Sequence, residues 1–285
     1  MPTFTSPDGT LLAYHVSGSF PGSGPVLLCL PGGPMQDSAY LGDLGGLTAF
    51  RTVVRLDLRG TGASAAPEDP SSYRCDRLVA DVEALRVHLG LDTVDLLGHS
   101  AGANLAALYT AAHPERVARL VLVTPGTAAV GLDTSGEERL AAAKRPWREE
   151  EPWFPEAYAA LEDLTSGRGG PETFAAVAPF FHGTWDEAAR RRNADTVTQR
   201  NGEAAGVYAG EGAFAPEATR AAFAEFGRPV LVVAGEGDAN TPVPTATAYA
   251  ELFPQSALAV LDGAGHFPWH DDAKWFATTV DGFLG

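Results

Sequence analysis

The pentapeptide Gly98-His99-Ser100-Ala101-Gly102 constrains the fold of this chain more than any other feature. It follows the apolar residues 93–97, which predict a buried strand, and it opens the alanine-rich segment 101–112, which predicts a closely packed helix. A serine at the tip of such a strand-to-helix turn takes strained backbone angles, and glycines two residues away on either side avoid collisions. We therefore expect Ser100 to be an exposed nucleophile for acyl transfer, the alternative being a structural serine in a tight turn.

Strand-like and helix-like segments alternate along most of the chain, which is typical of an α/β fold with a mostly parallel sheet and helices on both faces. Helical spacing of apolar residues marks 73–89, closed by Gly90. The predicted strands cover 11–16, 26–30, 53–57, 93–97, 120–123, 229–234 and 257–261, and the later predicted helices cover 246–253 and 272–284.

The segment 126–227 interrupts this alternation. It has no convincing strand pattern but several helix starts of the Pro-Glu or Trp-Asp-Glu type, and it holds 12 of the 26 aromatic residues. We interpret it as a helical cap inserted into the sheet domain, which is made of 1–125 and 228–285. Its aromatic side chains either line an apolar substrate cavity or form the core of a small helical subdomain.

A net charge of −16 argues against nucleic acid or an anionic membrane as partner, because an acidic surface repels both. No apolar run reaches membrane-spanning length and the first residues lack a leader pattern, so we expect a cytoplasmic protein. Cys29 and Cys75 read as isolated, buried, reduced thiols. We expect no cofactor and no metal, and a small-molecule or short peptide-like substrate; the oligomeric state stays open.

A serine nucleophile needs a base within hydrogen-bond reach, and the base needs an orienting carboxylate. In parallel sheets such groups gather at the carboxyl ends of the strands. Asp238 follows the predicted strand 229–234 and is the expected acid, with Glu236 as competitor. His266 follows the last predicted strand in a glycine-rich loop and is the expected base, which gives the chain order Ser, Asp, His.

The transition state of acyl transfer also needs donors aimed at the developing oxyanion. Pro31-Gly32-Gly33-Pro34 follows the predicted strand 26–30, so we expect the N–H of Gly33 to be one donor and that of Ala101 the other. The alternative is a Gly-Pro turn that binds nothing. We expect a structural role for the motif Asp57-Leu58-Arg59-Gly60-Thr61-Gly62, with Asp57 and Arg59 fixing a loop near the site.

These motifs together resemble the α/β-hydrolases over nearly the full chain, and within them the proline iminopeptidase branch. Gly32-Gly33-Pro34 is similar to that branch's His-Gly-Gly-Pro-Gly, and the motif that begins at Asp57 is similar to its Asp-Gln-Arg-Gly-x-Gly-x-Ser. The chain departs from the pattern at Pro31, which replaces the leading His, at Met35, which replaces the final Gly, and around Ser100, where the branch commonly has Gly-Ser-Trp-Gly.

The resemblance implies a serine peptidase or amidase whose cap carboxylates bind the free amine of the substrate. It maps these carboxylates onto Glu203 and Asp186, beside Trp185, and we also expect Gly32, Pro34 and Trp269 to contact substrate. Alternative activities are a carboxylesterase or lactonase and a carbon–carbon bond hydrolase. The same fold also serves a cofactor-free lyase and, as a different class, a non-enzymatic ligand receptor.

Overall fold

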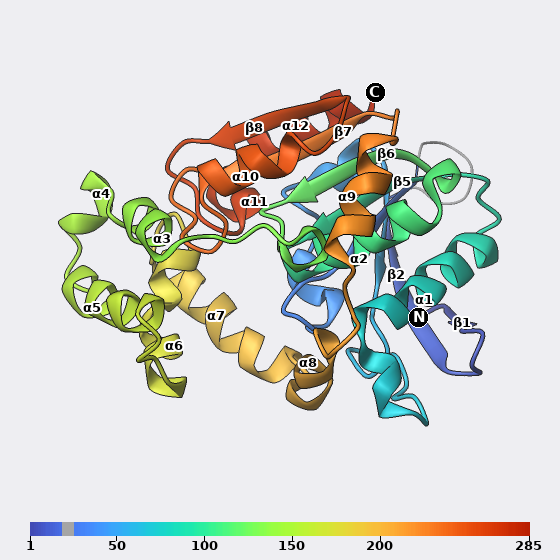
Figure 1. Ribbon diagram of the computed structural model, residues 1–285, viewed down its shortest axis with the longest axis horizontal. Coiled ribbons are helices and arrows are strands. Elements are labelled where there is room, and N and C mark those ends of the chain that lie inside the picture. Colours follow the sequence, from blue (N-terminus) through green and yellow to red (C-terminus); the bar gives the residue numbers. More distant parts are fainter. Residues whose placement is uncertain (19–25) are drawn as a thin grey trace.

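An eight-stranded sheet is the centre of the molecule, a computed structural model that describes residues 1–18 and 26–285 (Figure 1). The strand order is β1-β2-β4-β3-β5-β6-β7-β8; β1 and β2 run antiparallel and the remaining neighbours pair in parallel. This confirms the predicted α/β class. The bounds are β1 (Thr3–Thr5), β2 (Leu11–Ser17), β3 (Val26–Leu30), β4 (Thr52–Leu56), β5 (Val94–His99), β6 (Val117–Val123), β7 (Val230–Gly235) and β8 (Ser256–Leu261).

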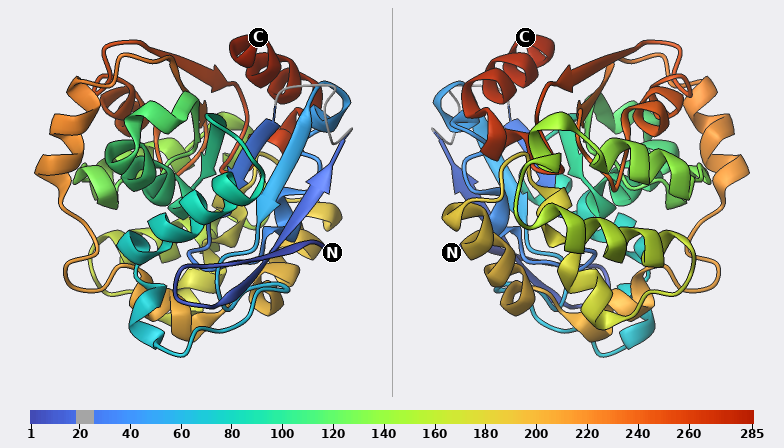
Figure 2. Two further views of the ribbon diagram at one scale, coloured as in Figure 1. Left: turned by 90° about the vertical axis from the view of Figure 1, so that its right-hand side faces the viewer. Right: turned by 90° about the vertical axis from the view of Figure 1, so that its left-hand side faces the viewer.

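The central strands bury both faces because successive side chains point to opposite sides of the sheet. In β3, Leu28 and Leu30 belong to the core on one face, whereas Leu27 and Cys29 belong to the core on the other. Helices flank both faces (Figure 2). The first core is shared with α1 (Cys75–His88), α2 (Ala101–Ala112), α9 (Pro216–Ala224) and α10 (Val243–Ala250), and the second with α12 (Ala273–Leu284) and the short helices η1 (Ser38–Leu41) and η2 (Leu47–Ala49).

Between β6 and β7 the described chain contains helices and no strand. Its helices α3 to α6 form a group beside the sheet, and α7 leads back toward it (Figure 1). A separate core that includes Phe154, Leu161, Val177 and Phe180 holds the first half of this insertion together, so part of its aromatic content is structural. The remaining bounds are α3 (Gly136–Ala143), α4 (Pro146–Glu149), α5 (Phe154–Thr165), α6 (Pro171–Ala176), α7 (Glu187–Gln199), α8 (Gly202–Tyr208) and α11 (Pro268–Asp271), with the short helices η3 (Pro70–Tyr73), η4 (Pro114–Arg116), η5 (Ala128–Val130) and η6 (Ala178–Phe181).

Every predicted strand and helix is present; 26–30 and 101–112 have the predicted ends, and the others differ by a few residues. Helix α10 begins at Val243, three residues before its predicted start, because Pro242 ends the preceding loop. The three-residue edge strand β1 is too short to show an alternating pattern, and the short helices α3, α4 and α8 were not predicted. Among the described residues, no helix has the length and apolar character needed to cross a membrane.

The loop after β4 is fixed by buried charges, as expected for the Asp57 motif. The carboxylate of Asp57 accepts hydrogen bonds from the N–H and Oγ of Ser38, at 3.1 and 2.6 Å, and from the N–H of Ala63 at 3.0 Å. Arg59 donates from Nε and Nη2 to both oxygens of Asp81, a carboxylate with no exposed surface. The motif thereby ties the loop to α1 and to η1, in the segment that follows β3. Cys29 and Cys75 are both free and buried, as predicted.

Candidate active site

Ser100 stands at the turn between β5 and α2 with a backbone that only a tightly constrained turn can hold. Its φ and ψ are 53° and −124°, and its side chain is partly exposed. The surrounding glycines are required by close backbone approach. A Cβ on Gly98 would lie 2.7 Å from Cα of Ala103, and one on Gly102 would collide with the carbonyl oxygen of Leu30. The close backbone approach at both glycines accounts for the spacing of the motif around a serine with strained backbone angles.

Asp238 and His266 meet beyond the ends of β7 and β8. The Oδ2 atom of Asp238 lies 2.8 Å from Nδ1 of His266, and its Oδ1 accepts the N–H of Asn240 at 2.8 Å. Asp238 has no exposed surface and His266 is 4% exposed. The competitor Glu236 is engaged elsewhere, since its Oε2 accepts the N–H of Gly263 at 2.9 Å. A buried carboxylate on Nδ1 orients the ring so that Nε2 is the nitrogen available for proton transfer.

The backbone of His266 is held from three directions. Its N–H donates to the carbonyl oxygen of Phe181 at 2.8 Å, and the Phe181 ring lies edge-on, with its centre 5.6 Å from the imidazole centre. Its carbonyl oxygen accepts from Oγ1 of Thr124 at 2.9 Å and from Nε2 of His99 at 3.0 Å. The proposed base is therefore fixed by the insertion, by the loop after β6 and by the residue just before Ser100.

The loop after β6 bonds to the main chain of Ser100 as well as to that of His266. The carbonyl oxygen of Ser100 accepts the N–H of Gly126 at 2.8 Å, two residues beyond Thr124. Within the described chain no hydrogen bond links Oγ of Ser100 to His266. Catalytic hydrogen bonds of this kind are often long without substrate and tighten in the complex.

The glycine loop after β3 packs directly on the serine. A Cβ on Gly32 would lie 2.8 Å from Cβ of Ser100 and 3.3 Å from the nitrogen of Ala101. The N–H of Gly32 donates to Oη of Tyr40 at 2.7 Å, so the exposed Gly33, with φ 114°, carries the N–H that this loop can offer a substrate. Ala101 is the first residue of α2, where backbone N–H groups have no partner within the helix.

His99 is the site residue that sequence reasoning missed. Its Nδ1 lies 2.7 Å from Oη of Tyr40, and its ring centre lies 5.0 Å from that of His266. Burial, reinforced by His266, holds the pKa of His99 well below its usual value. The sequence feature that could have indicated its role is its position directly before Ser100 at the end of a buried strand, where a polar ring needs hydrogen-bond partners.

Comparison with known proteins identifies the family. The family described as the alpha/beta hydrolase fold matches residues 25–273. The chain belongs to the α/β-hydrolase family. It is 27% identical over 274 residues to the proline iminopeptidase of Heyndrickxia coagulans, covering 92% of this chain and 91% of the relative. It is 31% identical over 233 residues to the N-formylmaleamate deformylase of Pseudomonas putida, covering 81% and 78%. Among solved structures, the esterase RhEst1 from Rhodococcus sp. ECU1013 superposes with a TM-score of 0.70 at 26% identity, covering 99% of this chain and 98% of that one.

Some side chains expected to contact substrate have other partners in this α/β-hydrolase. Asp186 caps α7, its carboxylate accepting the N–H of Ala189 at 2.8 Å, and Glu203 is exposed in the first turn of α8. Trp269 is only 2% exposed, packs with its ring centre 4.8 Å from that of His99, and belongs to the core that α12 shares with the sheet. Trp185 is half-buried, with its ring centre 5.2 Å from that of His182.

Pro34 lies where the insertion of this α/β-hydrolase contacts the glycine loop. Its carbonyl oxygen accepts Nε of Arg200 at 3.2 Å, and the next carbonyl, of Met35, accepts the N–H of Asn201 at 2.9 Å. The junction between α7 and α8 is thus hydrogen-bonded to the two residues that follow Gly33, one of the two candidate oxyanion donors. Pro34 itself is half-buried, which leaves part of it open to a ligand.

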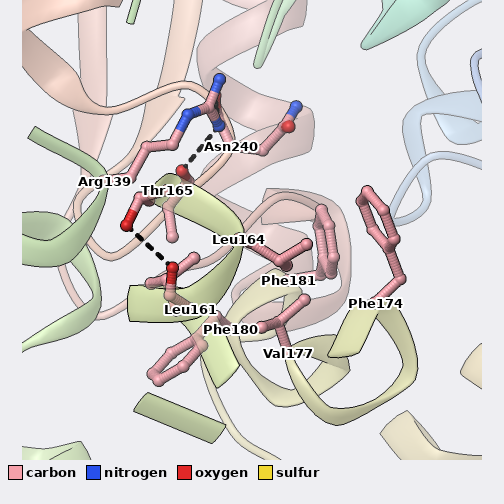
Figure 3. Close-up of a pocket in the computed structure, with 10 residues that line it drawn as sticks. Arg139, Leu161, Leu164, Thr165, Phe174, Val177, Phe180, Phe181 and Asn240 are labelled. Carbon is pink, nitrogen blue, oxygen red and sulfur yellow. Dashed lines mark hydrogen bonds between the residues drawn. The ribbon is translucent and has the colours of Figure 1, made fainter. Parts of the chain in front are cut away.

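An apolar cavity of about 300 Å³ lies inside the insertion, against the loop that carries Asp238. Figure 3 shows Phe174 and Phe181 on one side of it and Arg139 and Asn240 on the other. Phe181 is shared with the candidate site, because the same ring contacts His266. The walls are Arg139, Leu161, Leu164, Thr165, Phe174, Val177, Phe180, Phe181, Ala239 and Asn240.

Proposed function

We propose that this α/β-hydrolase is a serine hydrolase that works through an acyl-enzyme at Ser100. The observation that carries the proposal is the buried pair formed by Asp238 and His266, at 2.8 Å, with His266 bonded to the residue that directly precedes a serine held at φ 53°. A carboxylate buried on Nδ1 stabilises the imidazolium that forms when Nε2 takes a proton, so the pair suits base catalysis.

The reaction then has two halves. His266 removes the Ser100 proton as Oγ attacks the acyl carbon, and the imidazolium returns that proton to the leaving group. In the second half, His266 takes a proton from water as the water attacks the acyl-enzyme, and the imidazolium gives that proton to Oγ of Ser100 as the bond to the acyl group breaks and the acid product leaves. The N–H groups of Gly33 and Ala101 stabilise the oxyanion in both halves.

The substrate we propose first is an N-terminal aminoacyl amide or a related small amide. The names of two relatives support it, one a proline iminopeptidase at 27% identity and one a deformylase at 31%. An amide also requires protonation of its leaving amine, which His266 can supply.

An ester or lactone is the second candidate, and one observation favours it. An aminopeptidase needs a carboxylate for the substrate amine, yet Asp186 is engaged in capping α7 and Glu203 points from an exposed helix turn. The similarity to the RhEst1 esterase, at 26% identity, also supports a substrate whose acyl group carries no charge.

The nucleophile is tested with a fluorophosphonate probe and the Ser100→Ala variant. We expect the probe to label the wild type at Ser100, and Ser100→Ala to lose turnover and labelling while its thermal unfolding midpoint is unchanged. Ser166→Ala is the matched control, because the Ser166 hydroxyl bonds to the carbonyl oxygens of Glu162 and Asp163 in the helix that it ends. Turnover that survives in Ser100→Ala contradicts the proposal.

The substrate class is tested by comparing aminoacyl anilides that carry a free amine with their N-acetyl forms, alongside 4-nitrophenyl esters. An aminopeptidase should prefer the free amine by at least roughly tenfold in kcat/KM, since a charge-assisted contact is worth about 1.5–3 kcal/mol. Equal rates on both anilides, together with faster ester cleavage, would move the assignment to an esterase. Ligand binding with no turnover of any substrate would favour a receptor.

A further inference from the structure

Three arginines of the insertion hold the main chain on both sides of Asp238. Arg145 donates from Nη2 to the carbonyl oxygen of Glu236 at 2.9 Å, and Arg148 donates from Nη1 to that of Gly237 at 2.6 Å. On the other side, Nη1 of Arg139 donates to the carbonyl oxygens of Ala239 and Asn240, at 3.1 and 2.9 Å. We call Arg139, Arg145 and Arg148 the arginine clamp.

Arg148 joins the acid loop to the loop that holds His266. It is 1% exposed, and its Nη2 donates to the carbonyl oxygen of His182 at 2.7 Å. The preceding residue, Phe181, accepts the N–H of His266. A Cβ on Gly237 would lie 3.0 Å from Cζ of Arg148, so a side chain there would push the guanidinium away.

The positive charges of the arginine clamp have few carboxylates in direct contact. Among the ion pairs of the described residues, Arg145 contacts Glu236 at 4.0 Å, and neither Arg139 nor Arg148 contacts a carboxylate. Burial lowers the pKa of Arg148 to about 10 and also lowers the pKa of Arg139, while the negative charge of Asp238 opposes both shifts. Uncharged donors could bond these carbonyls without that desolvation cost, so the positive charge itself requires an explanation.

We propose that the arginine clamp positions Asp238 against His266 and keeps positive charge beside the pair. This role rests on the proposed function, in which Asp238 is the acid and His266 the base. The positive charge attracts the carboxylate of Asp238 and opposes a second positive charge on the neighbouring imidazole, so removing it should make His266 easier to protonate.

Other charged or titratable groups around the pair come from the remaining elements packed against it. They are His99 at the end of β5, His182 in the loop after η6, Arg192 on α7, Glu236 after β7, and His270 and Asp271 on α11. Burial keeps His99, His182 and His270 neutral at pH 7, because it lowers the pKa of each. These three rings therefore carry no charge at pH 7, and a change of the clamp acts on the pair and on Asp271, whose pKa burial raises and the charge of Arg148 lowers.

The experiment measures kcat and KM for 4-nitrophenyl acetate from pH 5 to 8, with thermal unfolding of each variant. Arg148→Met removes the charge and keeps much of the volume, Arg148→Lys keeps the charge, and Asp238→Asn is assayed in parallel. The matched control is Arg191→Met, an insertion arginine with its side chain 72% exposed.

We expect Arg148→Met to move the acidic half-maximum of kcat/KM upward by about half a pH unit or more. Its kcat should fall roughly tenfold with KM nearly constant, because a misplaced base slows chemistry more than binding. Arg148→Lys should restore the position of the half-maximum, and Arg191→Met should match the wild type in every measurement.

A folded Arg148→Met enzyme with the wild-type half-maximum overturns the proposal. If that variant does not fold, Arg139→Gln replaces it, because Arg139 is only half-buried. An unshifted half-maximum of kcat/KM in Arg139→Gln overturns the proposal equally. Wild-type rates in Asp238→Asn would instead overturn the assignment of the acid, so failure of the clamp and failure of the proposed function give different results.

Discussion

Nε2 of His99 lies 3.0 Å from the carbonyl oxygen of His266, so the residue before the candidate nucleophile holds the main chain of the candidate base. The positions of the protons in this network are fixed by the N–H of Gly32 at one end of it. The N–H of Gly32 can only donate, so Oη of Tyr40 accepts it and turns its own proton toward Nδ1 of His99. Nε2 of His99 must then carry the ring's proton, which is the tautomer that a carbonyl acceptor requires.

Tyr40→Phe should therefore impair both stability and catalysis. It leaves the buried Nδ1 of His99 without a donor and the N–H of Gly32 without an acceptor, a loss of about 1–3 kcal/mol in the free energy of unfolding. We expect kcat to fall because the glycine loop loses its anchor. Urea unfolding and steady-state kinetics measure the two effects, and Tyr158→Phe, in the insertion, is the matched control. An unchanged free energy of unfolding in Tyr40→Phe would show that the network contributes nothing.

Stability should decline as the pH falls from 6.5 toward 4. Burial lowers the pKa of His182 to about 3 and of His270 to about 4, and holds that of His99 well below its usual value. Below pH 6.5 these histidines bind protons in the unfolded chain but stay neutral in the folded one. The free energy of unfolding therefore falls as the pH falls, by up to about 1.4 kcal/mol per pH unit for each histidine. Urea unfolding between pH 7 and 4 measures the slope. His270→Gln should reduce it, and an identical slope in that variant would contradict the assignment.

Arg59→Met should be among the most destabilising single changes. It strands the fully buried carboxylate of Asp81, which accepts two hydrogen bonds from Arg59, and removing one partner of a buried pair costs about 3–5 kcal/mol. Arg77→Met is the control, since the Arg77 side chain is 65% exposed. Denaturant unfolding of both variants gives the comparison, and equal losses would show that burial of the pair is unimportant.

Gly98→Ala and Gly206→Ala should have opposite effects. A Cβ at Gly98 would lie 2.7 Å from the backbone of the turn, so alanine must displace the start of α2 and lower both stability and activity. Gly206 lies inside α8 with open space around it, and alanine there should stabilise by roughly 0.5–1 kcal/mol. Thermal unfolding separates them, and a harmless Gly98→Ala would remove the steric explanation of the motif.

The sequence predicted what depends on local pattern. The strands, the turn at Ser100, and the positions of Asp238 and His266 after their strands follow from residue order and from the rule that parallel strands present their carboxyl ends at one edge. It could not predict contacts between distant segments. Nothing near Arg148 in the chain indicates that its guanidinium reaches Gly237, and the acidic residues of the insertion look equivalent until the structure separates the helix cap Asp186 from the others.

The anchoring of His266 by its peptide groups has a practical consequence. Its N–H and carbonyl oxygen hold the loop through Phe181, Thr124 and His99, and these bonds survive any change of the side chain. His266→Gly would accordingly leave an imidazole-shaped vacancy in an otherwise intact loop. Such a vacancy suits chemical rescue, in which free imidazole added to the inactive variant takes the place of the missing ring and its substituted analogues set the rate by their basicity.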